Sequence, residues 1–155
     1  MPPDNEDCMI IPVQNEHEAE WNDLCIALWP QYNIDDILRL KQDGWFRNEF
    51  LYFFDKKAVA FISLSLRQDY VEGTRTSPVA YIEGLYVNPD YRNRGIARKL
   101  VSYAKKWAYE KNCQELASDT ELVNQSSQKF HEMVGFTKAN TIVCYTMKIS
   151  KSYPD

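Results

Sequence analysis

A cluster of positive charge interrupts an acidic sequence directly after a stretch typical of a β-strand. The stretch is Val79–Val87, and Asn88-Pro89-Asp90 then forms a turn that leads into a helix. The first N–H groups of a helix lack partners within it and the helix dipole is positive there, so this position can hold a pyrophosphate. Gly95 leaves room for the phosphates, and four basic residues surround it: Arg92, Arg94, Arg98 and Lys99. The pattern predicts an anionic ligand, although neither a Walker loop nor a GxGxxG fingerprint is present.

Two acids, one histidine and one tryptophan each have an ordinary structural explanation beside a functional one. Glu83 stands in an apolar strand, where an acid without a partner is costly. Asp119 follows a short strand and could equally be a turn or capping residue. His131 lies on a predicted helix, where a structural role is the more common one. Trp29 ends an amphipathic helix, so core packing and ligand contact are both open.

The composition limits the class of protein. The chain has 155 residues, 45% of them hydrophobic and 26% charged, with a net charge of −4, which fits one folded domain and argues weakly against nucleic-acid binding. No apolar stretch approaches the roughly 20 residues of a membrane span. The cysteines have no zinc-knuckle or CxxC spacing, so we expect reduced, mostly buried thiols and no metal: Cys8, Cys25, Cys113 and Cys144. We expect a soluble, cytoplasmic protein.

The periodicity predicts the order β-α-α-β-β-β-α-β-α-β, a mixed α/β domain. Asn15 and Glu18 have the spacing of a capping box, and Gly84 within its strand indicates a bulge or a close approach by other backbone or a ligand. Residues 1–8 are expected to form a flexible tail and residues 9–155 a single domain. Strands are predicted at 9–13, 50–54, 58–66, 79–87 and 114–118 and as a final pair within 136–149; helices are predicted at about 15–29, 34–43, 95–111 and 124–134.

Arg92-x-x-Gly95-x-Ala97 after a strand resembles the acetyl-coenzyme A signature R/Q-x-x-G-x-G/A of the GNAT N-acetyltransferases. Val134-Gly135-Phe136 is similar to the "GF" that follows the last main helix of that family. The closer resemblance is to aminoglycoside 6′-N-acetyltransferases. It rests on four stretches: Leu28-Trp29-Pro30; Tyr70-Val71 with Gly73-Thr74 and Thr76-Ser77-Pro78-Val79-Ala80; Glu83-Gly84; and Ala117-Ser118-Asp119 with Asn124-Gln125.

This resemblance implies a mainly antiparallel central sheet that is splayed between two strands and flanked by helices on both faces. It implies acetyl-CoA as cosubstrate. The strand backbone of Leu85, Tyr86 and Val87 would bind the pantetheine arm, and the side chain of Asn124 would add a further contact. The pyrophosphate would be held by the turn: Asn93, Arg94, Gly95, Ile96, Ala97 and Arg98.

The resemblance also implies roles in catalysis and in substrate binding. Asp119 would be the base that takes a proton from the substrate amine, and Glu83 would bind the amine or share that role. His131 replaces the tyrosine that many GNAT enzymes use as acid; it could donate a proton or simply pack beside the coenzyme, with water as the alternative donor. The substrate contacts would be Trp29, Tyr32, Tyr70, Glu83 and Asp119, with Asp35, Asp36 and Glu72 deepening the negative field.

The implied function is transfer of an acetyl group to the 6′-amine of aminoglycosides by direct attack in a ternary complex, conferring antibiotic resistance. Two alternatives stay open: a GNAT enzyme for another amine (a polyamine, small metabolite or peptide), or a non-catalytic module that binds coenzyme A. The expected partner is a small polycationic amine, with no nucleic acid and no membrane. A homodimer is implied by the resemblance only. A long C-terminal strand segment could pair across subunits, but no periodicity indicates an interface.

Overall fold

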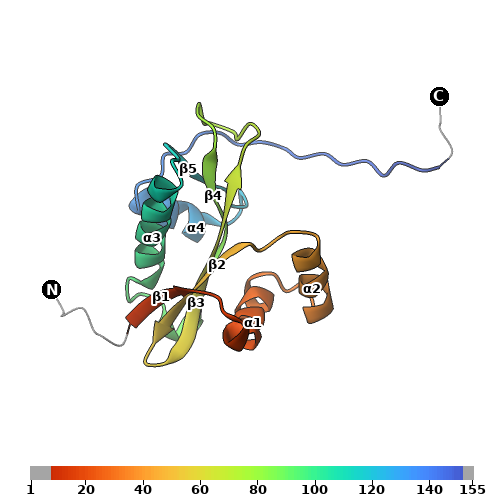
Figure 1. Cartoon of the computed structure of the whole chain (residues 1–155). Coiled ribbons are helices and arrows are strands. Elements are labelled where there is room, and N and C mark those ends of the chain that lie inside the picture. Colours follow the sequence, from red (N-terminus) through yellow and green to blue (C-terminus); the bar gives the residue numbers. More distant parts are fainter. Residues whose placement is uncertain (1–7, 152–155) are drawn as a thin grey trace.

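The computed structural model describes residues 8–151, and within them five strands form one sheet in the order β1-β2-β3-β4-β5 (Figure 1). Neighbouring strands are antiparallel from β1 to β4, and β4 pairs with β5 in parallel. This confirms the mixed, mainly antiparallel sheet. The strands are β1 Cys8–Pro12, β2 Asn48–Phe54, β3 Lys57–Arg67, β4 Val79–Val87 and β5 Leu116–Ser118.

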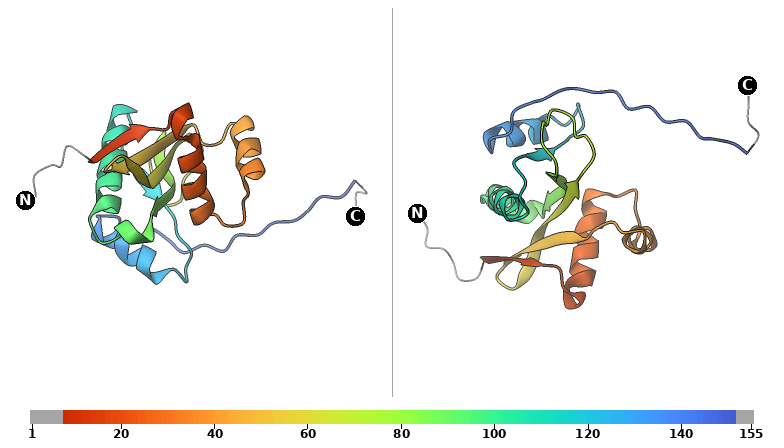
Figure 2. Two further views of the ribbon diagram at one scale, coloured as in Figure 1. Left: turned by 90° about the horizontal axis from the view of Figure 1, so that it is seen from below. Right: turned by 45° about the horizontal axis from the view of Figure 1, so that its top comes forward.

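Helices cover both faces of the sheet, as expected. Figures 1 and 2 show α1 and α2 on one side and α3 and α4 on the other. The helices are α1 Glu18–Leu28, α2 Ile34–Gln42, α3 Ile96–Glu110 and α4 Gln125–Met133. Among residues 8–151, none of the helices has both the length and the apolar character needed to cross a bilayer.

Each helical layer buries its own apolar cluster against the sheet. On one face α1 contributes Trp21 and Cys25, which are fully buried with Leu51 and Phe61 of the strands. On the other face α3 contributes a stripe spaced by three or four residues, as a helix with one buried side requires: Ile96, Leu100, Val101, Ala104, Trp107 and Ala108. Both faces of the sheet are therefore covered by an apolar cluster. Functional groups are then expected at the ends of the strands or at irregularities in their pairing.

The hairpin between β2 and β3 follows from its turn residues. Asp55 and Lys56 have positive φ angles of 49° and 64°, the conformation of a two-residue type I′ turn. The pairing Phe54↔Lys57 closes the turn directly. The strands extend one to two residues further than predicted, because main-chain pairing continues into the polar residues Asn48 and Arg67.

The bulge predicted at Gly84 is confirmed. The register between β3 and β4 shifts between Ser63 and Leu64, so that Glu83 is the extra residue on β4. Gly84 is buried beside the Trp29 ring, where an added Cβ would lie 2.5 Å from a ring carbon. The nearest atoms at this position belong to a tryptophan side chain, whereas the prediction named backbone or a ligand.

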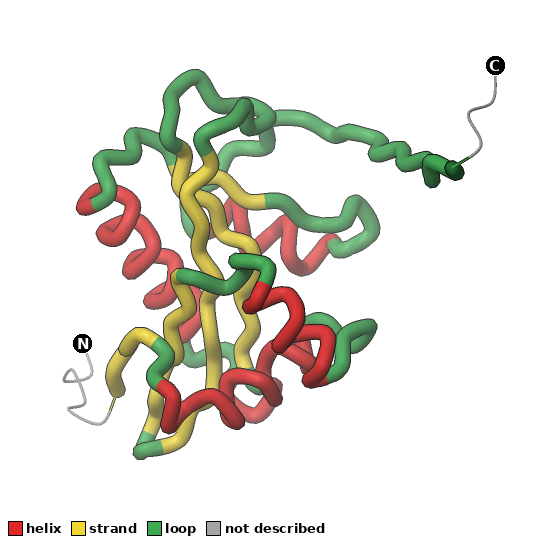
Figure 3. The backbone as a smooth tube through the Cα atoms, turned by 45° about the vertical axis from the view of Figure 1, so that its right-hand side comes forward, coloured by secondary structure: helices red, strands yellow, loops and turns green. Residues whose placement is uncertain are grey.

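The final pair of strands predicted within 136–149 is wrong for this chain. No strand follows α4 in the described residues, and residues 137–150 are all exposed. This segment begins beside the loop between β3 and β4, where Asn140 donates to Glu72 at 2.9 Å. Figure 3 shows it then running away from the body. Alternating apolar residues satisfy the strand pattern, but a strand also needs a partner, and the segment finds none within the described part of its own chain.

Smaller predictions need correction as well. A short 3₁₀ helix, Asn15–His17, precedes α1, and the Gln14 N–H donates to His17 Nδ1, so Asn15 and Glu18 form no capping box. Of the cysteine side chains described, Cys25 is buried, Cys113 half-buried and Cys144 exposed, all as free thiols, so the expectation of mostly buried thiols is wrong. The tail predicted for residues 1–8 lies outside the described residues except for Cys8, which begins β1.

Candidate active site

The sheet opens where β4 and β5 stop pairing. Their parallel register runs from Ala80↔Leu116 to Ile82↔Ser118 and ends there. β4 continues for five more residues, Glu83 to Val87, with its edge toward β5 unpaired by that strand. This is the splayed junction that the resemblance implied. Both predicted acids lie at it, Glu83 one residue past Ile82 and Asp119 one residue past Ser118.

Glu83 is held by a cation and a hydroxyl of β3. Arg67 donates from Nη2 to both carboxylate oxygens at 2.9 Å and from Nε to one of them at 3.1 Å. Ser65 Oγ donates to the same carboxylate at 2.6 Å. A two-pronged guanidinium contact fixes the orientation of a carboxylate as well as compensating its charge. The cost expected for an acid in an apolar strand is thus met by partners that the sequence pattern did not reveal.

Asp119 accepts the hydroxyl hydrogen of Tyr81, a residue of β4. Burial, and then the hydrogen bond to Asp119, raise the pKa of the Tyr81 phenol, which keeps it a neutral donor. The Arg67 guanidinium lies 3.4 Å from the centre of the Tyr81 ring. One continuous network therefore connects Glu83, Arg67, Tyr81 and Asp119 across the open end of the sheet.

His131 lies on α4 and faces the end of β5. Its Nε2 is 2.8 Å from Ser118 Oγ, and its Nδ1 is 2.7 Å from the carbonyl oxygen of Ser127. The ring packs against Phe136 with centroids 5.3 Å apart. The structure therefore places His131 beside the junction, on the sheet face of α3 and α4.

The turn before α3 has the features predicted for an anion site. Gly95 has φ = 79° and is the N-cap of α3 without any side-chain cap. The first helical bond is from Lys99 N–H to the Gly95 carbonyl, so the N–H groups of residues 96 to 98 are not used by the helix. No atom lies within 4 Å of where a Gly95 Cβ would stand, so the helix N-terminus is open. The phosphates of a coenzyme fit this donor set.

The basic and amide residues of this turn differ in their exposure and in the contacts that they already make. Arg98 and Lys99 are exposed, whereas Arg94 donates to the Asp90 carbonyl at 3.4 Å and stacks over Tyr91. Ile96 is buried, so only its main chain is available. Asn93 has a positive φ of 62° at the tip of the turn. Asn124 caps α4 through Oδ1, which accepts from Ser127 N–H at 3.1 Å, and this leaves its amide NH₂ for another partner.

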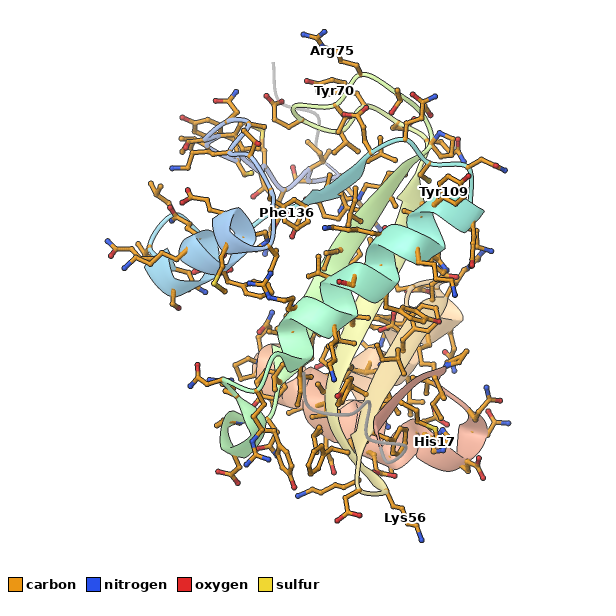
Figure 4. The ribbon with its side chains drawn as sticks, turned by 90° about the vertical axis from the view of Figure 1, so that its left-hand side faces the viewer. His17, Lys56, Tyr70, Arg75, Tyr109 and Phe136 are labelled. Atoms are coloured by element: carbon orange, nitrogen blue, oxygen red, sulfur yellow. The ribbon has the colours of Figure 1, made fainter. Side chains whose placement is uncertain are left out.

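The predicted substrate residues are divided between the core and the surface. Trp29 packs against Phe46 and Phe61 with centroids 5.8 Å away in each case, and Tyr32 packs on the same cluster. Tyr70 is 76% exposed on the loop between β3 and β4, at the end of the molecule (Figure 4). Trp29 is half-buried and flanks β4 at Gly84, so it packs in the core, and its contact with a ligand stays a prediction.

Two of the three acids predicted to deepen the negative field already accept hydrogen bonds. Asp36 belongs to the capping box of α2, where it accepts from Asn33 N–H at 3.0 Å, while Asp35 is exposed. Glu72 accepts from Asn140.

Sequence reasoning missed the partners Ser65, Arg67, Tyr81 and Ser118. Alternation along the strands could have placed the first three on one face, but their pairing with Glu83 and Asp119 depends on the register between distant strands. A cavity of about 380 Å³ between α1, α2 and the start of β2 was also missed, and no predicted site residue lines it. Within residues 8–151 no group of three or more His, Cys, Asp or Glu side chains could hold a metal ion.

The family model described as the acetyltransferase (GNAT) family matches residues 12–136. Curated relatives match over almost their whole length. One is the aminoglycoside N(6′)-acetyltransferase type 1 of Acinetobacter genomosp. 13, 38% identical over 143 residues, which are 90% of this chain and 98% of the relative. The enzyme of the same name from Salmonella enteritidis is 36% identical and covers 83% of this chain and 91% of its own.

Solved structures agree with these relatives. AAC(6′)-Iy in complex with the bisubstrate analog CoA-S-monomethyl-acetylneamine superposes with a TM-score of 0.85 at 32% identity, covering 92% of this chain and 99% of its own. The aminoglycoside 6′-N-acetyltransferase AAC(6′)-Ih from Acinetobacter baumannii has a TM-score of 0.84 at 35% identity with the same coverage. The fold of this chain is therefore shared with a protein that was solved with a bisubstrate analog containing CoA.

Proposed function

Because the chain belongs to the acetyltransferase (GNAT) family, we propose that it transfers the acetyl group of acetyl-CoA to the 6′-amine of aminoglycosides and so confers resistance to them. The observation that carries the proposal is the similarity to named aminoglycoside N(6′)-acetyltransferases across 98% of the relative's length. The carboxylates at the splayed junction, Glu83 and Asp119, give that similarity a chemical basis. We also keep the expectation that the protein acts in the cytoplasm, which cell fractionation would test.

Acetyl-CoA would be held mainly by main chain. The free N–H groups at the start of α3 and the turn from Asn93 to Arg98 suit the pyrophosphate. The edge of β4 that β5 leaves unpaired, at Leu85, Tyr86 and Val87, suits the amides of the pantetheine arm, with the Val87 carbonyl already accepting from Arg92 Nε at 2.9 Å. The amide NH₂ of Asn124 would reach the same ligand. Bound there, the cosubstrate supplies an acetyl thioester, and every other task falls to the chain.

Those tasks are deprotonation of the amine, stabilisation of the oxyanion and protonation of the leaving thiolate. Asp119 is the better candidate for the base. It is exposed and has a neutral phenol as its partner, whereas Glu83 is bound at two points by Arg67. Glu83 would then contribute to amine binding and to the geometry of the junction. A main-chain N–H of Leu85 or Tyr86 would meet the oxyanion.

A polycationic sugar would be recognised by negative charge and by aromatic surface. Trp29 and Tyr32 lie on the α1 and α2 side of the sheet, and Tyr70 and Glu72 lie on the loop between β3 and β4. Trp29 lies beside Gly84, the residue after Glu83. Aromatic surface next to a carboxylate would favour an amine carried on a sugar ring over a small free amine.

We also propose a homodimer formed through the C-terminal segment. Residues 141–150 carry five large apolar side chains that are 60% to 89% exposed: Ile142, Val143, Tyr145, Met147 and Ile149. β5 is an edge strand of only three residues. An exposed apolar segment that finds no strand partner in the described part of its own chain, together with an open sheet edge, favours pairing with a second copy. Sedimentation should give a dimer for the full chain and a monomer for a variant that lacks residues 141–155.

The proposal is tested by acetyl-CoA-dependent thiol release with two matched aminoglycosides, one with a 6′-amine and one with a 6′-hydroxyl, and with spermidine as control. Release with the 6′-amine alone is expected. Equal release with every amine, or with spermidine alone, would indicate a GNAT enzyme for another substrate. Coenzyme binding without any release would favour the non-catalytic module.

A further inference from the structure

A hydroxyl and an imidazole form a close pair at the point where β4 and β5 separate. Ser118 is the last residue of β5, and its Oγ lies 2.8 Å from Nε2 of His131 on α4. Both residues are half-buried. The His131 ring packs against the Phe136 ring, with centroids 5.3 Å apart. Figure 4 shows Phe136 near β5 and α4.

The contact of the second ring nitrogen, Nδ1 of His131, determines the direction of the hydrogen bond between Ser118 and His131. Nδ1 lies 2.7 Å from the Ser127 carbonyl oxygen, an acceptor that requires a hydrogen on Nδ1. In the neutral ring Nε2 is therefore an acceptor and receives the Ser118 hydroxyl hydrogen. In the protonated ring Nε2 donates to Ser118 Oγ instead, and the hydroxyl hydrogen is free to point elsewhere. A polar pair held by a third group in this way is the arrangement found where protons are transferred.

The position of Ser118 fits a role at the reacting end of the cosubstrate. Ser118 pairs with Ile82, the last residue of β4 before the splay. The edge of β4 that β5 leaves unpaired runs from there to Val87, five residues further on, which is roughly 17 Å at about 3.3 Å per residue. The helix N-terminus that suits the pyrophosphate follows Val87 after the turn. An arm laid along that edge from the turn would bring its far end to Ser118.

We propose that Ser118 is a catalytic residue that protonates the leaving thiolate and that His131 is the positioning residue that replaces its proton. This inference rests on the proposed function. As the carbon–sulfur bond breaks, its electron pair stays on sulfur, and the Ser118 hydroxyl gives its proton to that sulfur. The Nε2 proton of the imidazolium moves to Ser118 Oγ, and the ring is left neutral with its Nδ1 hydrogen on Ser127. Solvent water then returns a proton to Nε2.

Kinetics give the first readout. Ser118→Ala should lower kcat with the 6′-amine substrate by about 100-fold, as expected for loss of a general acid, and leave the KM for acetyl-CoA within about twofold. Ser118→Thr keeps a hydroxyl and should retain most of the activity. Ser102→Ala, on the exposed side of α3, is the matched control and should be unchanged. Adding His131→Phe to Ser118→Ala should cost little more, because the two residues act as one unit.

A second readout does not depend on turnover. The chain has two histidines, and His17 lies far from the junction, toward the opposite end of the molecule (Figure 4), so it serves as an internal reference in ¹⁵N NMR. Coenzyme A should move the Nε2 resonance of His131, whereas desulfo-coenzyme A, which lacks the thiol, should not. Ser118→Ala should abolish the difference between the two ligands.

Three results would overturn the assignment. One is a kcat within twofold of wild type for Ser118→Ala in a folded protein, and another is equal His131 shifts with both ligands. The third is an acetyl group on Ser118, detected by peptide mass spectrometry after incubation with acetyl-CoA alone, because the hydroxyl would then be a nucleophile. Failure of the proposed function is recognised separately, since the wild-type enzyme would then show no 6′-amine-dependent thiol release.

Discussion

Two glutamates lie on the same face of the sheet, and their surroundings are opposite. Glu83 on β4 has a guanidinium and a hydroxyl on its carboxylate. Glu49 on β2 is 7% exposed, and within the described residues neither of its carboxyl oxygens has a well-formed hydrogen bond. Burial raises the pKa of Glu49 to about 8, with Glu83 adding to the rise, while Ser63, Trp21 and Lys41 offset part of it.

The carboxylate of Glu83 accepts hydrogen bonds from a cation and a hydroxyl, whereas the buried carboxyl group of Glu49 has no well-formed hydrogen bond within the described residues. At the splayed junction, each carboxylate accepts a hydrogen bond that orients it. At the start of β2, the carboxyl group is protonated near neutral pH and contributes packing. The first arrangement is expected to control turnover, and the second is expected to control stability. Variants of each region can therefore test the comparison separately.

The largest expected effect concerns the stability of the Glu49 region. The folded state holds the Glu49 proton up to about pH 8, whereas the unfolded chain loses it near the ordinary value of 4.5. Stability is therefore highest below pH 4.5 for this group and falls as the pH rises to 8, by a free energy of unfolding on the order of 4 kcal/mol. Urea denaturation of Glu49→Gln should lack this fall and should show a more stable protein at pH 8.5, with normal kcat. Equal pH dependence in both proteins would contradict the comparison.

The next effect is the loss of the proposed base. Asp119→Asn should lower kcat by about 10² to 10³-fold, because the amide cannot take the proton of the amine. Coenzyme binding, measured by calorimetry, should stay unchanged. Asp23→Asn, on the exposed side of α1, is a matched control. Wild-type turnover by Asp119→Asn across the pH range would remove Asp119 from this role.

Removing the cation of the network should have a smaller effect. Arg67→Met leaves the Glu83 carboxylate with Ser65 alone and should lower kcat/KM by about tenfold. The side chain of Arg67 is 41% exposed, so solvent screening limits the loss of folding stability to about 1 kcal/mol. Kinetics and urea denaturation on the same preparation separate the two effects. A variant that loses stability without losing kcat/KM would make the Arg67 contact purely structural.

The smallest effect is expected at Tyr81. Tyr81→Phe removes one donor from the Asp119 carboxylate and should lower kcat by about fivefold, the equivalent of about 1 kcal/mol for one hydrogen bond. The ring remains beneath Arg67, so the KM for the aminoglycoside should hold. An unchanged kcat would show that Asp119 needs no orienting phenol.

Much of the fold could be predicted from local patterns. The apolar run Val79–Val87 and the turn after it indicated the bounds of β4 correctly, and Asn33 and Gly44 marked the ends of α2 as capping chemistry requires. The segment 136–149 could not be predicted in the same way. Its residues suit a strand, but a strand depends on a partner that local sequence does not describe.

The candidate site shows the same division. The turn at Gly95 and the acids Glu83 and Asp119 follow from motif and resemblance, because each is recognisable next to its own strand. Their partners Arg67 and Tyr81 depend on the bulge between Ser63 and Leu64, which sets the register of β3 against β4. The role proposed for Ser118 depends on its contact with His131 of α4, which the sequence pattern does not show. Contacts between distant elements are the part that sequence patterns leave open.

The most direct test of the account is the position of the acetyl group in the product. An aminoglycoside with several amines, including one at 6′, would be incubated with acetyl-CoA and the enzyme, and the product examined by mass spectrometry and two-dimensional NMR. The account predicts a single added acetyl group on the 6′ nitrogen. An acetyl group on any other nitrogen, or an unmodified aminoglycoside, would contradict it.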